Sequence, residues 1–151
     1  MDFNEYVKIL NRKLKYNNKD KIFICIGNSS ILWDSIGPKV GTNLKKIDKK
    51  ISCIGSEKNN ICSKYDLIKY YTKIQNKFII AIDVAINEID RKNDVYITNT
   101  AISIGSAFTK NRGTIGNLSI KAAISNWQNI KKEEINYIAE FISQGIYEVM
   151  N

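Results

Sequence analysis

The sequence predicts one α/β domain over residues 1–151, built on a mostly parallel β-sheet with helices on both faces. Continuous apolar runs, such as KIFICIG at 21–27 and KFIIAIDVAI at 77–86, are typical of strands buried on both faces. Amphipathic helical segments alternate with these runs, which is the pattern of strand–helix–strand crossover units. Apolar residues make up 44% of the 151 residues, so the chain is long and apolar enough to bury one core.

Each element follows from its local pattern. The expected helices carry apolar side chains three and four positions apart and cover 3–15, 38–47, 63–75 and 132–150. The expected strands are apolar runs bounded by turn residues and cover 21–27, 51–55, 77–86, 94–100 and 118–124. Pro38, the only proline, suits the first turn of its helix, where no backbone donor is needed. Glu133 and Glu134 suit the start of the last helix, where the helix dipole favours negative charge.

The absence of histidine is the most informative feature of the composition. Histidine is the commonest general base and a common metal ligand, so a Ser-His-Asp or Cys-His mechanism is excluded within this chain. Any acid–base chemistry must use Asp, Glu, Lys, Tyr or Cys. We expect no metal and no cofactor, because the chain also lacks a Gly-x-Gly-x-x-Gly or Gly-Lys-Ser/Thr phosphate-binding motif.

Cysteine usage and the lack of a signal-like N-terminal segment predict a cytosolic protein. Cys25, Cys53 and Cys62 are odd in number, widely spaced and without a Cys-x-x-Cys pair, which argues against disulfides and a zinc site. The N-terminus lacks the apolar segment of a secretory signal, and no apolar run is long enough to span a bilayer. The net charge of +8 is spread along a Lys-, Asn- and Ile-rich chain, so nucleic-acid binding is the weaker interpretation of the charge.

Two aspartates are candidates for a catalytic pair. Asp34 lies in the loop after the first strand, and Asp83 ends the apolar run FIIAID. In a parallel sheet, ligands bind at the carboxyl ends of the strands, so these carboxylates are expected at one edge. Two carboxylates held close together have separated pKa values, so one can act as a base and the other as an acid. The alternative is that each aspartate only caps a helix or turn, which would leave no activity at this edge.

Residues 103–117, SIGSAFTKNRGTIGN, form a glycine-rich segment expected to be a long loop. Its backbone N–H groups could face an anion or a carbonyl oxygen, with Lys110 and Arg112 adding positive charge. A surface loop without function is the alternative. Trp33, beside Asp34, either walls the site or packs in the core.

Three blocks of the chain resemble a known family, in the family's order. The block ICIGNSSILWDSIGPKVGTNL, the strand FIIAIDVAI and the glycine-rich loop followed by LSIKAAI resemble the YyaC-type sporulation protein family. The resemblance covers residues 20–150, and the first block is its most specific part. That family is similar in fold to the spore germination protease and to hydrogenase maturation proteases. The resemblance therefore implies a three-layer α/β/α sandwich of the phosphorylase/hydrolase-like kind.

The resemblance also implies roles for single residues. Asp34 and Asp83 match the two aspartates implicated in proteolysis by the germination protease. Asn28 and Ser35 near the first aspartate, and Gly105, Ser106 and Lys110 in the glycine-rich loop, are the predicted substrate-binding residues. The chain departs from the family pattern at positions 107 and 112–114, and it is much shorter than the germination protease.

The first functional hypothesis is an aspartate-dependent peptidase that acts on a spore or cytosolic protein in the cytoplasm of a sporulating cell or forespore. The second is a catalytically inactive protease fold that serves as a binding or regulatory protein in sporulation. The expected partner is a protein or peptide substrate, without membrane association, and a homo-oligomer is left open. Binding of nucleic acid through the basic surface is the third and weakest hypothesis.

Overall fold

The chain is described from a computed structural model, which covers residues 1–86, 92–103 and 114–151. The helices are α1 (Phe3–Lys15), α2 (Ile36–Ile47), α3 (Lys64–Ile68), α4 (Tyr71–Ile74) and α5 (Lys132–Met150), with a short 3-10 helix η1 (Leu32–Asp34). The main-sheet strands are β1 (Lys21–Cys25), β2 (Cys53–Ile54), β3 (Phe78–Ile86), β4 (Asp94–Thr98) and β7 (Leu118–Ile124). Two further strands, β5 (Ile102–Ser103) and β6 (Thr114–Ile115), pair with each other.

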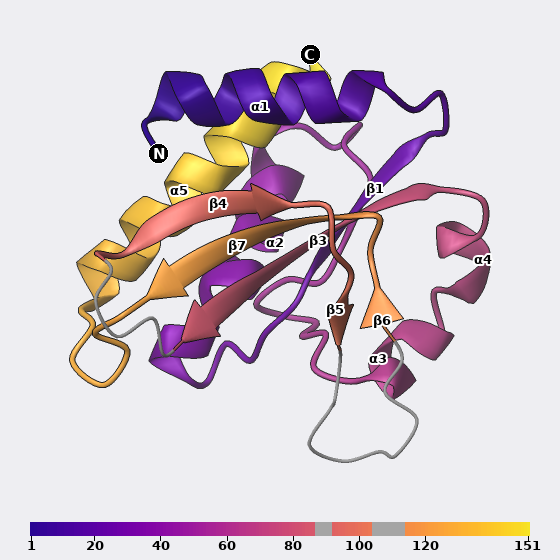
Figure 1. The fold of residues 1–151 in the computed structure, drawn as a ribbon. Coiled ribbons are helices and arrows are strands. Elements are labelled where there is room, and N and C mark those ends of the chain that lie inside the picture. Colours follow the sequence, from indigo (N-terminus) through magenta and orange to yellow (C-terminus); the bar gives the residue numbers. More distant parts are fainter. Residues whose placement is uncertain (87–91, 104–113) are drawn as a thin grey trace.

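The main sheet has the strand order β2-β1-β3-β7-β4 (Figure 1). The first four strands in this order are parallel, and β4 pairs antiparallel with β7 at the edge. The predicted fold class, a mostly parallel sheet flanked by helices, is therefore confirmed. The antiparallel direction of β4 is an addition that the apolar pattern did not specify.

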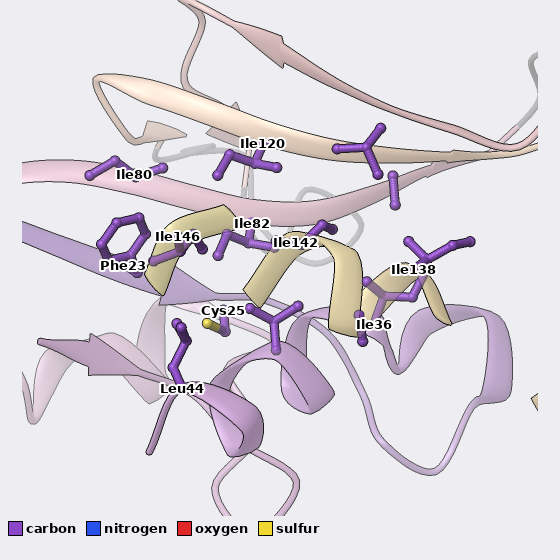
Figure 2. Close-up of a cluster of buried hydrophobic side chains, with 14 of the residues drawn as sticks. Phe23, Cys25, Ile36, Leu44, Ile80, Ile82, Ile120, Ile138, Ile142 and Ile146 are labelled. Carbon is purple, nitrogen blue, oxygen red and sulfur yellow. The ribbon is translucent and has the colours of Figure 1, made fainter. Parts of the chain in front are cut away.

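A large apolar cluster fills one face of the sheet under α1, α2 and α5. Figure 2 shows α5 residues such as Ile138, Ile142 and Ile146 over strand residues that include Ile82 and Ile120. All of these side chains are buried. The Tyr6 hydroxyl of α1 donates to the carbonyl of Ile142 at 2.9 Å, which ties the first helix to the last.

The opposite face carries a smaller apolar cluster under α3 and α4. Its buried members are Ile22, Ile24, Ile26, Ile54, Ile61 and Ala81. The partly buried side chains of Leu67, Tyr70 and Ile74 pack on it. The sheet thus has a thickly covered face and a thinly covered one.

Several predicted boundaries need correction. The single helix expected over 63–75 is two short helices, because α3 ends at Ile68 and α4 begins only at Tyr71. The long loop expected over 103–117 includes β6. No helix within the described ranges combines the length and apolar character needed to cross a membrane.

Candidate active site

Asp83 lies within β3, three residues before its end, rather than at the end of the strand as predicted. The neighbouring strand β1 stops earlier, because the last pair of the β1–β3 ladder is Cys25 with Ile82. Asp83 is therefore the first residue of β3 beyond the carboxyl end of β1. Side chains alternate between the faces of a strand, so Asp83 shares the thinly covered face with Ala81. Asp83 therefore lies just past the carboxyl end of β1, while β3 itself continues for three more residues.

Asp34 ends η1, directly before α2, and η1 contacts both β3 and α5. The backbone N–H of Asn28 donates to the Asp34 carboxylate at 3.1 Å and to the Asp34 carbonyl at 3.1 Å. The N-cap of α2 is Ser35, and α2 has no side-chain cap. The Asp34 carboxylate is thus held by the loop that leaves β1 and does not cap the following helix.

Two glycines let this loop fold tightly over the end of β1. Gly27 has a φ of +148°, and a Cβ on it would lie 2.2 Å from the Asp34 carbonyl oxygen. A Cβ on Gly37 would lie 2.0 Å from the carbonyl oxygen of Ile26. Both distances are far inside van der Waals contact, so a side chain at either position would displace the backbone that carries Asp34. This close packing gives a physical reason for the glycines of the block IGNSSILWDSIGP.

Burial raises the pKa of both candidate carboxyls. The pKa of Asp83 rises to about 7, chiefly because the group is buried, and the negative charge of Asp34 raises it further. The Val84 N–H, which donates to Asp83 at 2.7 Å, and the charge of Lys121 lower it. Burial also raises the pKa of Asp34, while the hydrogen bond from Asn28 lowers it. The structure therefore brings the two aspartates within electrostatic reach of each other.

Lys121 is a member of the site that the sequence pattern alone did not reveal. It stands opposite Asp83 in the ladder between β3 and β7, and opposite Tyr96 on the other side. Residues paired in this way present side chains on the same face of a sheet. A sequence signal existed, because Lys121 is the one charged residue in the apolar strand LSIKAAI.

The exposed thiol of Cys62 lies at the margin of the same region. Its Sγ donates to the carbonyl of Gly27 at 3.1 Å. Burial raises the pKa of this thiol, and the charges of Asp66, Asp34 and Asp83 raise it further. A raised pKa leaves little thiolate at neutral pH, so Cys62 is a poor nucleophile and a useful reporter on both aspartates.

The predicted substrate-binding residues fall into two groups. The Asn28 side chain accepts from the Ser30 backbone and hydroxyl, at 2.9 and 2.6 Å, and is partly buried beside Asp34. Ser35 is only 2% exposed and donates its hydroxyl to the Leu32 carbonyl, which gives it a structural part in this turn; a substrate contact stays a prediction. The other three, Gly105, Ser106 and Lys110, lie outside the described residues.

Trp33 is partly buried and packs against the large apolar cluster. Its ring meets that of Trp127 edge to face, with centroids 5.6 Å apart, and so joins η1 to the segment between β7 and α5. Across the described ranges, no group of three or more His, Cys, Asp or Glu side chains could hold a metal ion. The chemistry this arrangement can support is proton transfer between carboxyls of different pKa.

Comparison with solved structures defines the class of fold. A [NiFe] hydrogenase maturation protease, HycI from Thermococcus kodakarensis KOD1, aligns over 92% of this chain and 99% of its own, with 14% identity and a TM-score of 0.58. An uncharacterized protein from Wolinella succinogenes aligns over 86% and 96%, with 11% identity and a TM-score of 0.55. The catalytic domain of CwlV, an N-acetylmuramoyl-L-alanine amidase from Bacillus (Paenibacillus) polymyxa var. colistinus, aligns over 87% and 98%, with 11% identity and a TM-score of 0.52. At these identities the likeness concerns the fold, so the chain has a protease-like α/β fold.

The chain belongs to the family described as "Protein of unknown function (DUF1256)", whose model matches residues 1–149. A search of the curated proteins found no significant match. The finer resemblance to the YyaC-type sporulation family stays a prediction.

Proposed function

We propose that this protein is an aspartate-dependent peptidase in which Asp34 and Asp83 form the catalytic pair. One observation carries the proposal. A partly buried aspartate on β3, with a pKa raised to about 7, lies in the electrostatic field of a second aspartate of raised pKa, which the loop leaving the adjacent strand β1 holds. Carboxyls with shifted and separated pKa values are what acid–base hydrolysis needs near neutral pH.

The separation of the two pKa values assigns the roles. Asp83 has the larger shift and is partly protonated near pH 7, so it is the general acid. Asp34 is the general base, because the Asn28 N–H lowers the pKa that burial raises and so favours the carboxylate form. A water molecule gives its proton to Asp34 as its oxygen bonds to the peptide carbonyl carbon. Asp83 then gives its proton to the amide nitrogen as the C–N bond breaks, and the Asp34 proton restores Asp83 through solvent.

Lys121 adjusts the pKa of the proposed general acid, Asp83. Its positive charge lowers the pKa of Asp83 and offsets part of the effect of burial. Without this charge, Asp83 would hold its proton more tightly and donate it less readily to the leaving group. Lys121 is therefore a positioning and tuning residue in the proposal.

The proposed setting is the cytoplasm of a sporulating cell or forespore, and the proposed substrate is a spore protein or another cytosolic protein. This part rests on the motif resemblance in the block WDSIGP and the strand AIDVA. A hydrolytic reaction is compatible with the solved structures of similar fold, which include a maturation protease and an amidase. The proposal is equally compatible with a monomer and with a homo-oligomer.

The test is turnover of small acid-soluble spore proteins by the wild type and by Asp34→Asn and Asp83→Asn. Each substitution keeps the shape of the side chain and removes the proton transfer, so we expect cleavage to fall by roughly 10²- to 10⁴-fold. Asp20→Asn is the matched control, because Asp20 pairs with Lys77 at 3.4 Å outside the site. Equal cleavage by all variants would remove the catalytic proposal.

The binding-module hypothesis is separated by the same proteins. A stoichiometric complex with an intact spore protein, unchanged by either substitution and without cleavage, would assign the chain as a regulatory or binding protein. Cleavage lost in both variants, with the control unaffected, would assign it as the enzyme.

A further inference from the structure

A pocket lined by four lysines lies apart from the candidate active site. Its lining residues are Lys45, Lys49, Lys50, Ile51, Ser52, Cys53 and Lys73, and its volume is about 530 Å³. The lysines come from the end of α2, the turn before β2, and α4. None of the residues assigned to the aspartate site lines it.

The charge of this pocket is not balanced within the described part of the protein. No carboxylate is among the lining residues. Elsewhere in the described chain, Lys39 pairs with Glu57 at 3.7 Å and Lys77 with Asp20 at 3.4 Å. The four pocket lysines form no ion pair with any described residue. The nearby Asp48 carboxylate accepts the backbone N–H of Lys50 at 2.9 Å and pairs with none of the four ammonium groups. A concave site lined by charges of one sign concentrates ions of the other.

The ammonium groups converge on the pocket from different elements. Burial raises the pKa of the Cys53 thiol, and the charges of Lys45, on α2, and Lys73, on α4, lower it, so both ammonium groups act on this one lining residue. The dipole of α2 explains a basic residue in its own last turn, such as Lys45. It does not explain Lys49, Lys50 or Lys73, which lie outside that helix.

We propose that this pocket binds a compact multivalent anion carrying at least two linked phosphate groups. The volume is within the range of small-molecule sites. Lysine binds phosphate as a point charge, and the Ser52 side chain adds a hydroxyl that makes no hydrogen bond with the described residues. A long nucleic acid fits less well, because the lysines surround a hollow instead of forming a stripe, and no aromatic side chain of the described residues lines it for base stacking.

The test is calorimetric titration of the full chain with inorganic pyrophosphate, phosphate and ADP. We expect saturable 1:1 binding of pyrophosphate and ADP, weaker binding of single phosphate, and affinities that fall as salt rises. If ADP and pyrophosphate bind with equal affinity, the site recognises the linked phosphates alone. If ADP binds more tightly, the same site also contacts the nucleoside.

Two double variants make the test specific. Lys45→Gln/Lys73→Gln should weaken pyrophosphate binding at least tenfold. Lys8→Gln/Lys15→Gln, which removes the same charge from exposed positions of α1, should leave binding nearly unchanged. Circular dichroism checks that each variant is folded, which is expected since all four side chains are exposed.

Three results would overturn the proposal. The first is no saturable pyrophosphate binding to the wild type at millimolar concentration. The second is an equal loss in both double variants, which would make binding a property of net charge. The third is binding of duplex DNA in preference to pyrophosphate. The Asp34→Asn and Asp83→Asn variants should bind pyrophosphate normally, so this proposal and the peptidase proposal can fail separately.

Discussion

The two faces of the sheet differ in how much apolar surface covers them. On one face, three helices of 12 to 19 residues bury a large cluster that runs from Tyr6 to Ile146. On the other, the short helices α3 and α4 cover a cluster of six buried side chains. Asp83 and Lys121 lie on this second face. The difference indicates that the first face supplies most of the stability, while the second carries a partly buried carboxyl.

The energetic cost of Asp83 should be the largest consequence of this difference. Its pKa in the folded protein is about 7, against 3.8 for an ordinary aspartate, so the folded state holds the proton that the unfolded state has lost between these pH values. Stability must then fall as pH rises from about 4 to 7. Asp83→Asn removes this loss and should raise the free energy of unfolding at pH 8 by about 4 kcal/mol. Urea unfolding from pH 4 to 8 measures it.

The wild type and Asp83→Asn should have nearly equal stability close to pH 4, where Asp83 is largely protonated in the folded state and about half protonated in the unfolded state. Asp20→Asn serves as the control, and it should keep the pH slope of the wild type. Parallel pH profiles for the wild type and Asp83→Asn would show that Asp83 ionises at no cost in the folded protein, and the raised pKa would then be wrong.

The next effect compares the cores of the two faces directly. Ile142→Ala removes a fully buried side chain from the large cluster and should cost roughly 3 kcal/mol. Leu67→Ala removes a partly buried side chain from the small cluster and should cost only about 1 kcal/mol, in line with the modest effect of most substitutions. Urea unfolding of both variants gives the two values. Equal costs would remove the distinction between the faces.

A smaller effect is expected where η1 is anchored. Trp33 meets Trp127 edge to face, and such pairs contribute about 1 kcal/mol beyond simple burial. Trp127→Leu keeps an apolar side chain but removes the ring pair, so it should lower the free energy of unfolding by about that amount. Tryptophan fluorescence during unfolding reports it, since Trp33 then remains as the one indole. An unchanged midpoint would mean that the ring pair does not hold η1.

The reactivity of Cys62 should change least. The negative charges of Asp34 and Asp83 raise the pKa of this thiol. Asp83→Asn should lower that pKa, so alkylation at neutral pH should become faster. The buried Cys25 and Cys53 should react slowly, and Asp20→Asn should leave the rate unchanged. Mass spectrometry of the labelled chain measures the rate of alkylation. Identical rates for the wild type and Asp83→Asn would show that the charge of Asp83 does not act on the Cys62 thiol.

How far the sequence predicts this fold depends on the range of the interactions involved. Local patterns predict the strands at 21–27 and 77–86 and the long helix at 132–150, because burial on both faces or along one stripe leaves a clear periodic signal. They miss the break between α3 and α4, because apolar spacing continues across Lys69 and Tyr70. The insertion of β7 between β3 and β4 is a non-local choice that no local pattern records.

The candidate site shows the same division. Asp34 and Asp83 can be picked out as candidates from the sequence, since each follows an apolar run and ligands bind near the carboxyl ends of parallel strands. The register between β1 and β3 is not readable from the sequence. It sets the last pair of this ladder at Cys25 and Ile82, so Asp83 is the first residue of β3 without a partner on β1. Lys121 escapes prediction because only the pairing of β3 with β7 brings it opposite Asp83.

The proposed site depends on Asp34 and Asp83 sharing one electrostatic environment. The decisive experiment is the pH titration of the Asp83 side-chain carboxyl carbon by NMR, in the wild type and in Asp34→Asn. We expect a pKa of about 7 in the wild type and a lower value once the charge of Asp34 is removed. An ordinary aspartate value in the wild type, or the same value in both proteins, would show that the two carboxyls do not form a pair.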